Sequence, residues 1–363
     1  MSEFYTEKIE KSPRIDKLKA DLFKLPPQIE ADRAVLLTES YKATEGEPII
    51  MRRAKAFEHI LDNIPIIIRD GELIAGSATI RPRSCQVFPE FSFEWLEKEF
   101  DTVATRTADP FYISEDTKKT LHEVYKYWKG KTTSDLATSY MTPETLMAMK
   151  HNMFTPGNYF YNGIGHVTVD YGKVITYGYS EYIEEIEDEL SSMRVSDGNY
   201  CKKHALLEAM LISLRAVIRY AKRYSRLAKE MAGRESDGKR REELLKISEA
   251  CDRVPEFGAR DFHEACQSFW FVQMLLQTES SGHSISPGRF DQYMYPHYKK
   301  SLEAGMSREQ AQELIDCVWV KLNDLNKCRD EVSAEGFAGY SLFQNLIVGG
   351  QDVHGEDATN DLS

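Results

Sequence analysis

Residues 163–174 carry the clearest structural pattern of this chain, and they read Gly-Ile-Gly-His-Val-Thr-Val-Asp-Tyr-Gly-Lys-Val. The ten residues 157–166 contain three glycines and two asparagines, which favour tight backbone turns. A short run of β-branched residues, 167–169, follows and is typical of a strand. The segment therefore predicts a tightly turned loop that brings His166 to the start of a short strand.

Much of the remaining chain has the periodicity of helices. Apolar residues recur every three or four positions over about residues 205–232, which predicts one long amphipathic helix that stops at Gly233. A capping-box pattern begins at Ser307, and Ser114 is expected to cap a further helix. Residues 262–276 are apolar nearly all round, so this helix is expected to be enclosed by other elements.

Strand-like stretches are few and short, at residues 66–68, 166–169 and 346–348. Isolated apolar strands between long helices predict an α/β fold with a buried, largely parallel sheet. The length of 363 residues would allow two or three domains, but no Pro-rich or Gly/Ser-rich linker separates any.

Composition excludes several classes of function. The formal net charge of -12 argues against nucleic acid as a partner, because no basic surplus exists to release counterions. No apolar run approaches the ~20 residues of a membrane span, and no apolar signal region occurs at the N-terminus, so a cytoplasmic protein is expected. The six cysteines are widely spaced without a C-x-x-C pair. We expect them to be buried small hydrophobes rather than disulfides or zinc ligands.

Three polar, glycine-rich segments, residues 157–166, 279–291 and 339–345, are flanked by apolar elements, as functional loops of α/β folds often are. They contain His166, His283, Ser284 and Tyr340, which could bind the hydroxyls of a small polyol and pass a proton to a departing one. The alternative is that each histidine satisfies buried backbone groups. No zinc spacing, G-x-S-x-G elbow or phosphate-binding loop is present, so no metal is expected.

Several of these segments, in the same order, resemble signature segments of the glycyl radical enzymes, a pyruvate formate-lyase-like superfamily. The resemblance extends from about residue 27 to the end. It is strongest to the B12-independent dehydratases of glycerol and 1,2-propanediol. The matching segments are residues 81–91, 132–142, 163–174, 282–293 and 344–351.

The resemblance implies that residues 1–363 form the N-terminal half of a ten-stranded α/β barrel surrounded by many helices. In that family an S-adenosylmethionine iron–sulfur activase installs a glycyl radical, and no cofactor is bound directly. The radical oxidises a cysteine to a thiyl, which removes hydrogen from C1 of the diol; a hydroxyl leaves C2 and an aldehyde results. Carried over by position, His166 and His283 would be catalytic, contacting and protonating the departing hydroxyl. Ser284 and Tyr340 would bind the substrate.

The chain also departs from the family pattern. Neither the segment of the thiyl cysteine nor that of the radical glycine occurs, so the chain alone is expected to be inactive. It is expected to be a truncated part of a dehydratase, which as a full-length protein would form a homodimer. Three alternatives remain open: one half of a split enzyme, a non-catalytic homologue that binds a polyol or a partner chain, and a glycyl radical lyase of another substrate.

Overall fold

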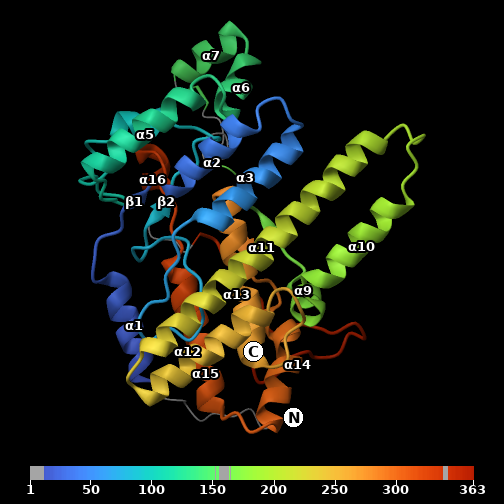
Figure 1. Ribbon diagram of the computed structural model, residues 1–363. Helices are drawn as coiled ribbons and strands as arrows, with labels where there is room; N and C mark the ends of the chain where they lie inside the picture. Colours follow the sequence, from blue (N-terminus) through green and yellow to red (C-terminus); the bar gives the residue numbers. More distant parts are fainter. Residues whose placement is uncertain (1–11, 152, 155–162, 164, 338–341) are drawn as a thin grey trace.

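The computed structural model describes residues 12–151, 153–154, 163, 165–337 and 342–363 (Figure 1). Within these ranges helices predominate, and four two-residue strands pair among them. The helices are α1 (Pro13–Phe23), α2 (Asp32–Ala43), α3 (Ile49–Asn63), α4 (Glu94–Glu99), α5 (Glu115–Trp128), α6 (Thr133–Ser139), α7 (Pro143–Lys150), α9 (Tyr171–Tyr177), α10 (Tyr179–Ser192), α11 (Tyr200–Arg234), α12 (Gly238–Arg253), α13 (Phe262–Ser280), α14 (Phe290–Glu303), α15 (Arg308–Asp324) and α16 (Glu331–Phe337).

Helix α13 is the centre of the core. Fifteen of its nineteen residues are buried, as expected from apolar residues that lie nearly all round the helix, and Phe269, Trp270 and Phe271 have no exposed surface. Helices α9, α12, α14 and α15 pack against it, and Figure 1 shows α11 crossing in front of it. Each fully buried large side chain contributes roughly 1.5–3 kcal/mol, so this helix is a rigid base for the loop that follows it.

The helix ends follow local sequence signals, with one exception. Ser307 forms the expected capping box with Gln310, and Ser114 accepts a hydrogen bond from the backbone of Thr117. The long helix α11, however, runs through Gly233 and ends at Arg234. The expected stop at Gly233 is wrong, because the chain leaves the helix at Glu235 with extended backbone.

The strands form two parallel pairs, which confirms the predicted parallel pairing. Strand β1 (Ile29–Glu30) pairs with β2 (Cys85–Gln86), and β3 (Val167–Thr168) pairs with β4 (Ile285–Ser286). In the third predicted strand only Leu346 forms a bridge, with Gly288. The expectation of a wholly buried sheet is wrong for β3, since both of its residues are exposed.

Residues 66–68 do not form the predicted strand. The backbone around them is satisfied by side chains of α11 instead of by another strand. The Arg223 guanidinium donates to the carbonyl of Ile64 at 2.7 Å, and the backbone of Ile67 bonds the Tyr224 hydroxyl. Because these backbone groups already have hydrogen-bond partners, they do not require a neighbouring strand.

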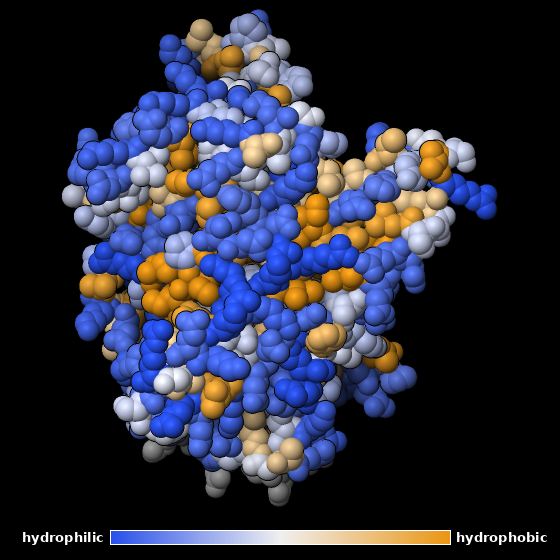
Figure 2. Space-filling model, in the orientation of Figure 1, coloured by the Kyte–Doolittle hydropathy of each residue, from blue (hydrophilic) through white to orange (hydrophobic). Residues whose placement is uncertain are grey.

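The cysteines are all free, as expected, but they are not all buried. Cys201, at the start of α11, is exposed because none of the first nine residues of that helix is buried, and Cys328 is only partly buried. The described helices include none that is both long and apolar enough to cross a bilayer. On the face in Figure 2, hydrophobic side chains gather along α3 and α11 around a groove of about 450 Å³.

Candidate functional site

Strand pairing brings two of the three predicted loops together. Because Val167 pairs with Ile285, His166 and Ser284 occupy matching positions just before β3 and β4. The imidazole rings of His166 and His283 stack, with centroids 5.0 Å apart and planes inclined by 22°. Three of the four predicted site residues therefore lie side by side, although more than a hundred residues separate the two histidines in the sequence.

Gly165 allows this close approach. A Cβ atom on Gly165 would lie 2.9 Å from the backbone nitrogen of His283 and 3.2 Å from Cα of Gly282. The sequence pattern indicated turns, but here this glycine also lets one loop lie directly against the other. Gly282 lies equally close to α13, since a Cβ atom on it would lie 1.7 Å from Oε1 of Gln277.

The loop before β4 has an uncommon backbone. Ser281 and Ser284 have φ angles of 58° and 61°, in the left-handed region that costs non-glycine residues about 1–2 kcal/mol each. The backbone nitrogen of Ser284 donates to the carbonyl of Leu342 at 2.8 Å. This hydrogen bond connects the strained loop to the third predicted segment.

The third segment lies beside β4. The Gln273 side chain, from α13, donates both to the carbonyl of Ile285 and to Oε1 of Gln344, each at 2.8 Å. The backbone nitrogen of Gly288 donates to the carbonyl of Asn345. Tyr340, the fourth predicted site residue, lies outside the described residues.

His283 lies in an apolar, positively charged environment. Its side chain is 3% exposed, and the rings of Phe337 and Phe343 lie edge-on to it. Burial, assisted by the charges of Lys327 and Arg329, lowers its pKa to about 4. At neutral pH the imidazole is therefore uncharged, with one nitrogen donating and the other accepting.

Lys327 is a residue of this site that the sequence analysis missed. Its side chain is 5% exposed, and its Nζ donates to the carbonyl oxygen of Ser281 at 2.5 Å and to that of Gly163 at 3.4 Å. Burial lowers its pKa to about 7. The local sequence gave no indication of this burial, because Lys327 stands three positions after the polar end of α15 and lysine is almost never fully buried without a specific partner.

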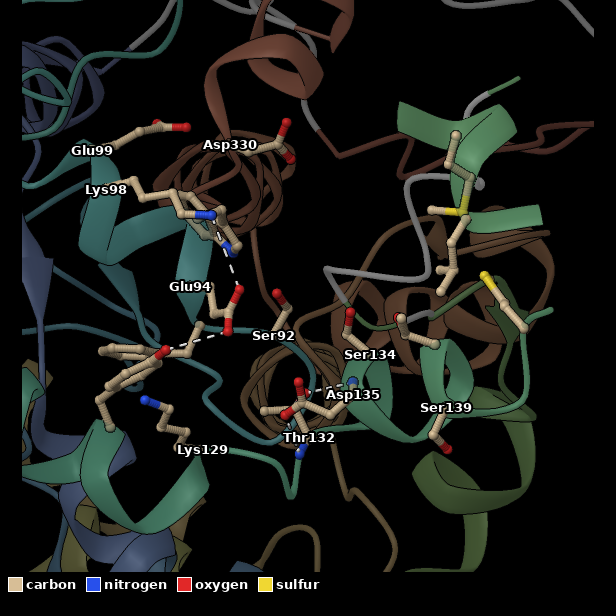
Figure 3. A pocket seen from close by; sticks show the side chains of 17 residues that line it. Ser92, Glu94, Lys98, Glu99, Lys129, Thr132, Ser134, Asp135, Ser139 and Asp330 are labelled. Atoms are coloured by element: carbon tan, nitrogen blue, oxygen red, sulfur yellow. Dashed lines mark hydrogen bonds and ion pairs between the residues drawn. The ribbon is translucent and has the colours of Figure 1, made fainter. Parts of the chain in front are cut away.

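A large cavity lies elsewhere among the described residues, and Figure 3 shows it from close by. It has a volume of about 970 Å³ and is lined mainly by residues of α4, α5, α6 and α7. Its polar groups largely bond one another: Tyr125 donates to Glu94, and Thr132 to Asp135. None of His166, His283 and Ser284 lines it. Among the described residues no group of three or more His, Cys, Asp or Glu side chains could hold a metal ion.

Comparison with known proteins bears on the family and the fold. The family model described as "Pyruvate formate lyase-like" matches residues 5–363. The chain belongs to the pyruvate formate lyase-like family. The fold expected from the resemblance, part of a glycyl radical enzyme barrel with many helices around it, is confirmed by solved structures of this family.

Two solved members of the pyruvate formate lyase-like family superpose on nearly the whole chain. A structure concerned with 1,2-propanediol dehydration in Roseburia inulinivorans is 65% identical, with a TM-score of 0.97, and covers 99% of this chain and 45% of that one. The glycerol-bound B12-independent glycerol dehydratase from Clostridium butyricum is 52% identical, with a TM-score of 0.95 and the same coverage.

The family also contains enzymes with other substrates. The isethionate sulfite-lyase of Desulfovibrio desulfuricans is 35% identical over 366 residues, which are 97% of this chain and 44% of that protein. The chain thus spans less than half the length of the relatives that it matches, and those relatives are lyases and dehydratases.

Proposed function

We propose that this chain forms the N-terminal part of a glycyl radical dehydratase that removes water from a small 1,2-diol, glycerol or propane-1,2-diol. The observation that carries the proposal is the neutral His283 stacked on His166 beside Ser284, on two paired strands. The 65% and 52% identity to proteins described with 1,2-propanediol and glycerol supports a diol as the substrate.

The rest of the protein would supply the thiyl that takes hydrogen from C1 of the diol. The residues of this chain would act on the hydroxyl groups. The Ser284 hydroxyl and the neutral imidazole of His283 would hydrogen-bond the diol and fix its orientation. The exposed imidazole of His166, beside them, would deliver the proton with which the C2 hydroxyl leaves as water. Tyr340, three residues before Phe343, would complete the binding of the substrate.

The partners follow from the same proposal. Radical formation would require an activating enzyme of the radical S-adenosylmethionine class, with its iron–sulfur cluster, and the full-length protein would act as a homodimer in the cytoplasm. No cofactor would bind this chain directly, and the chain alone would be inactive.

The test is anaerobic turnover by the full-length protein after activation, with glycerol, propane-1,2-diol and isethionate offered separately. We expect aldehyde from at least one diol and no sulfite from isethionate. Sulfite release from isethionate, with no aldehyde formed from either diol, would replace the proposal with a lyase of another substrate, as the name of the 35% identical relative describes. Calorimetric binding of a diol without any turnover would instead favour a non-catalytic homologue.

A further inference from the structure

The two loops that carry the histidines need an external restraint. Each of the serines that flank Gly282 and His283 has a left-handed backbone, and a strained loop keeps its shape only where its surroundings hold it. Arg33 holds the beginning of this loop, because its guanidinium donates to the carbonyl of Thr278 at 2.7 Å. Thr278 stands five residues before His283 in the sequence, so this hydrogen bond does not fix the imidazole itself.

Lys327 is the side chain that reaches both loops. Its Nζ donates to the carbonyl of Ser281, two residues before His283, and to the carbonyl of Gly163, three residues before His166. A single ammonium group thus connects the loop before β3 with the loop before β4. These oxygens belong to the backbone, so the link acts on the position of the loops and not on the imidazole nitrogens.

Lys327 is itself held in place. The preceding Asn326 donates from its amide to the carbonyl of Arg83 at 2.8 Å, and Arg106 donates to the carbonyl of Arg329 at 2.7 Å. The chain is therefore held to other parts of the fold on both sides of Lys327, at Asn326 and at Arg329. A small cavity of about 30 Å³, lined by Lys327, Ser281 and Gly282, is the free space next to it.

The same ammonium also acts on the charge of His283. Lys327, Arg329 and His166 are the ionisable groups that oppose a positive charge on this imidazole, and Arg329 is partly offset by Asp109 at 3.6 Å. Lys327 has a pKa of about 7, so it is charged throughout the lower pH range in which His283 would take up a proton. An ammonium at this place therefore favours the uncharged imidazole.

We propose that Lys327 is a positioning residue: it clamps the two histidine loops through Ser281 and Gly163 and holds His283 uncharged against His166. The contribution to catalysis rests on the proposed function, whereas the clamp does not.

The first experiment is Lys327→Met in the 363-residue chain, read by NMR of histidine-labelled protein with the His283 signal assigned from His283→Gln. We expect the pKa of His283 to rise by about 0.5 unit or more, because a nearby positive charge is lost. Lys321→Met is the matched control: Lys321 is equally buried, but its Nζ bonds Glu72 and Gly76. It should lower the melting temperature without moving the His283 signal.

Lys327→Arg keeps the charge and should retain the low pKa of His283; Lys327→Gln replaces Lys327→Met if the latter does not fold. A His283 titration that is the same in the wild type and in the uncharged variant would overturn the clamp.

In the activated full-length protein, Lys327→Met should lower kcat roughly 100-fold with a smaller change in KM, as expected for misplaced groups, and Lys327→Arg should recover part of it. Unchanged kcat would overturn the positioning role while leaving the diol dehydratase intact. Absence of turnover in the wild-type protein would refute the proposed function, and the NMR titration would still decide on the clamp.

Discussion

His283 and His166 stack on each other, yet His283 is buried while His166 is exposed to solvent. This difference separates their chemistry. The buried imidazole of His283 resists charging, whereas that of His166 is in contact with water. In the proposed dehydratase, His283 would bind the substrate and His166 would transfer the proton.

The burial of His283 predicts a pH-dependent stability. Its pKa is about 4 in the folded protein and 6.5 ordinarily, so between these values the unfolded chain binds the additional proton. The free energy of unfolding should consequently fall as pH decreases from about 6.5 to about 4, by at most about 1.4 kcal/mol per pH unit, and this effect should end below pH 4.

Urea unfolding at several pH values measures this effect, as the difference in the free energy of unfolding between the wild type and His283→Gln. The difference is needed because burial also lowers the pKa of His297. Identical pH profiles of the two proteins would contradict a buried, uncharged His283.

The close approach of the two loops predicts the effect of Gly165→Ala. The added methyl would lie 2.9 Å from the His283 backbone nitrogen, so β3 must move away from β4 and turnover of the full-length enzyme should fall at least tenfold. Gly233→Ala is the control, since no atom lies within 4 Å of its Cβ and α11 should gain up to about 1 kcal/mol. Activity assays and thermal melts of both variants check this; normal activity in Gly165→Ala would show that the approach is not required.

The buried ion pair of Arg33 and Glu90 predicts a large loss of stability in Glu90→Gln. The two side chains are 2% and 7% exposed, so the change leaves an uncompensated charge in the core, at a cost of about 3–5 kcal/mol. Glu58→Gln removes one partner of the exposed Arg219 and should cost less than about 1 kcal/mol. Urea denaturation compares them, and equal costs would mean that water reaches Arg33.

The left-handed backbone of Ser284 predicts opposite effects on folding and binding. Ser284→Gly should raise stability by up to about 1 kcal/mol, because glycine adopts this conformation without strain. It should also weaken diol binding by about 0.5–1.5 kcal/mol, through loss of the hydroxyl. Ser281→Gly, in the same backbone region, should give only the gain in stability. Melting curves and diol titrations distinguish the two, and unaltered affinity in Ser284→Gly would remove Ser284 from the binding site.

The helices and loops could be predicted from the sequence because their signals are local. Ser307 and Ser114 cap helices through residues three positions away, and the burial of α13 follows from apolar residues that lie nearly all round the helix. Residues 66–68 could not be assigned correctly, since their backbone partners belong to α11, more than a hundred positions later.

The site could be predicted only in part for the same reason. Glycines and polar residues identified the loops of His166, His283 and Ser284, but the stacking depends on strand register, to which the sequence gives no access. Lys327 was missed because its importance comes from carbonyl groups of two distant loops.

The parallel pairing of β3 with β4 has a consequence for the order in which the protein is made. Over a hundred residues must be added after His166 before His283 is synthesised. At ribosomal speeds of about 5–20 residues per second, β3 waits roughly 5–20 seconds for its partner. During this interval neither β4 nor Lys327 has been synthesised. The loop before β3 therefore lacks these native contacts and is open to non-native ones until the loop of His283 follows.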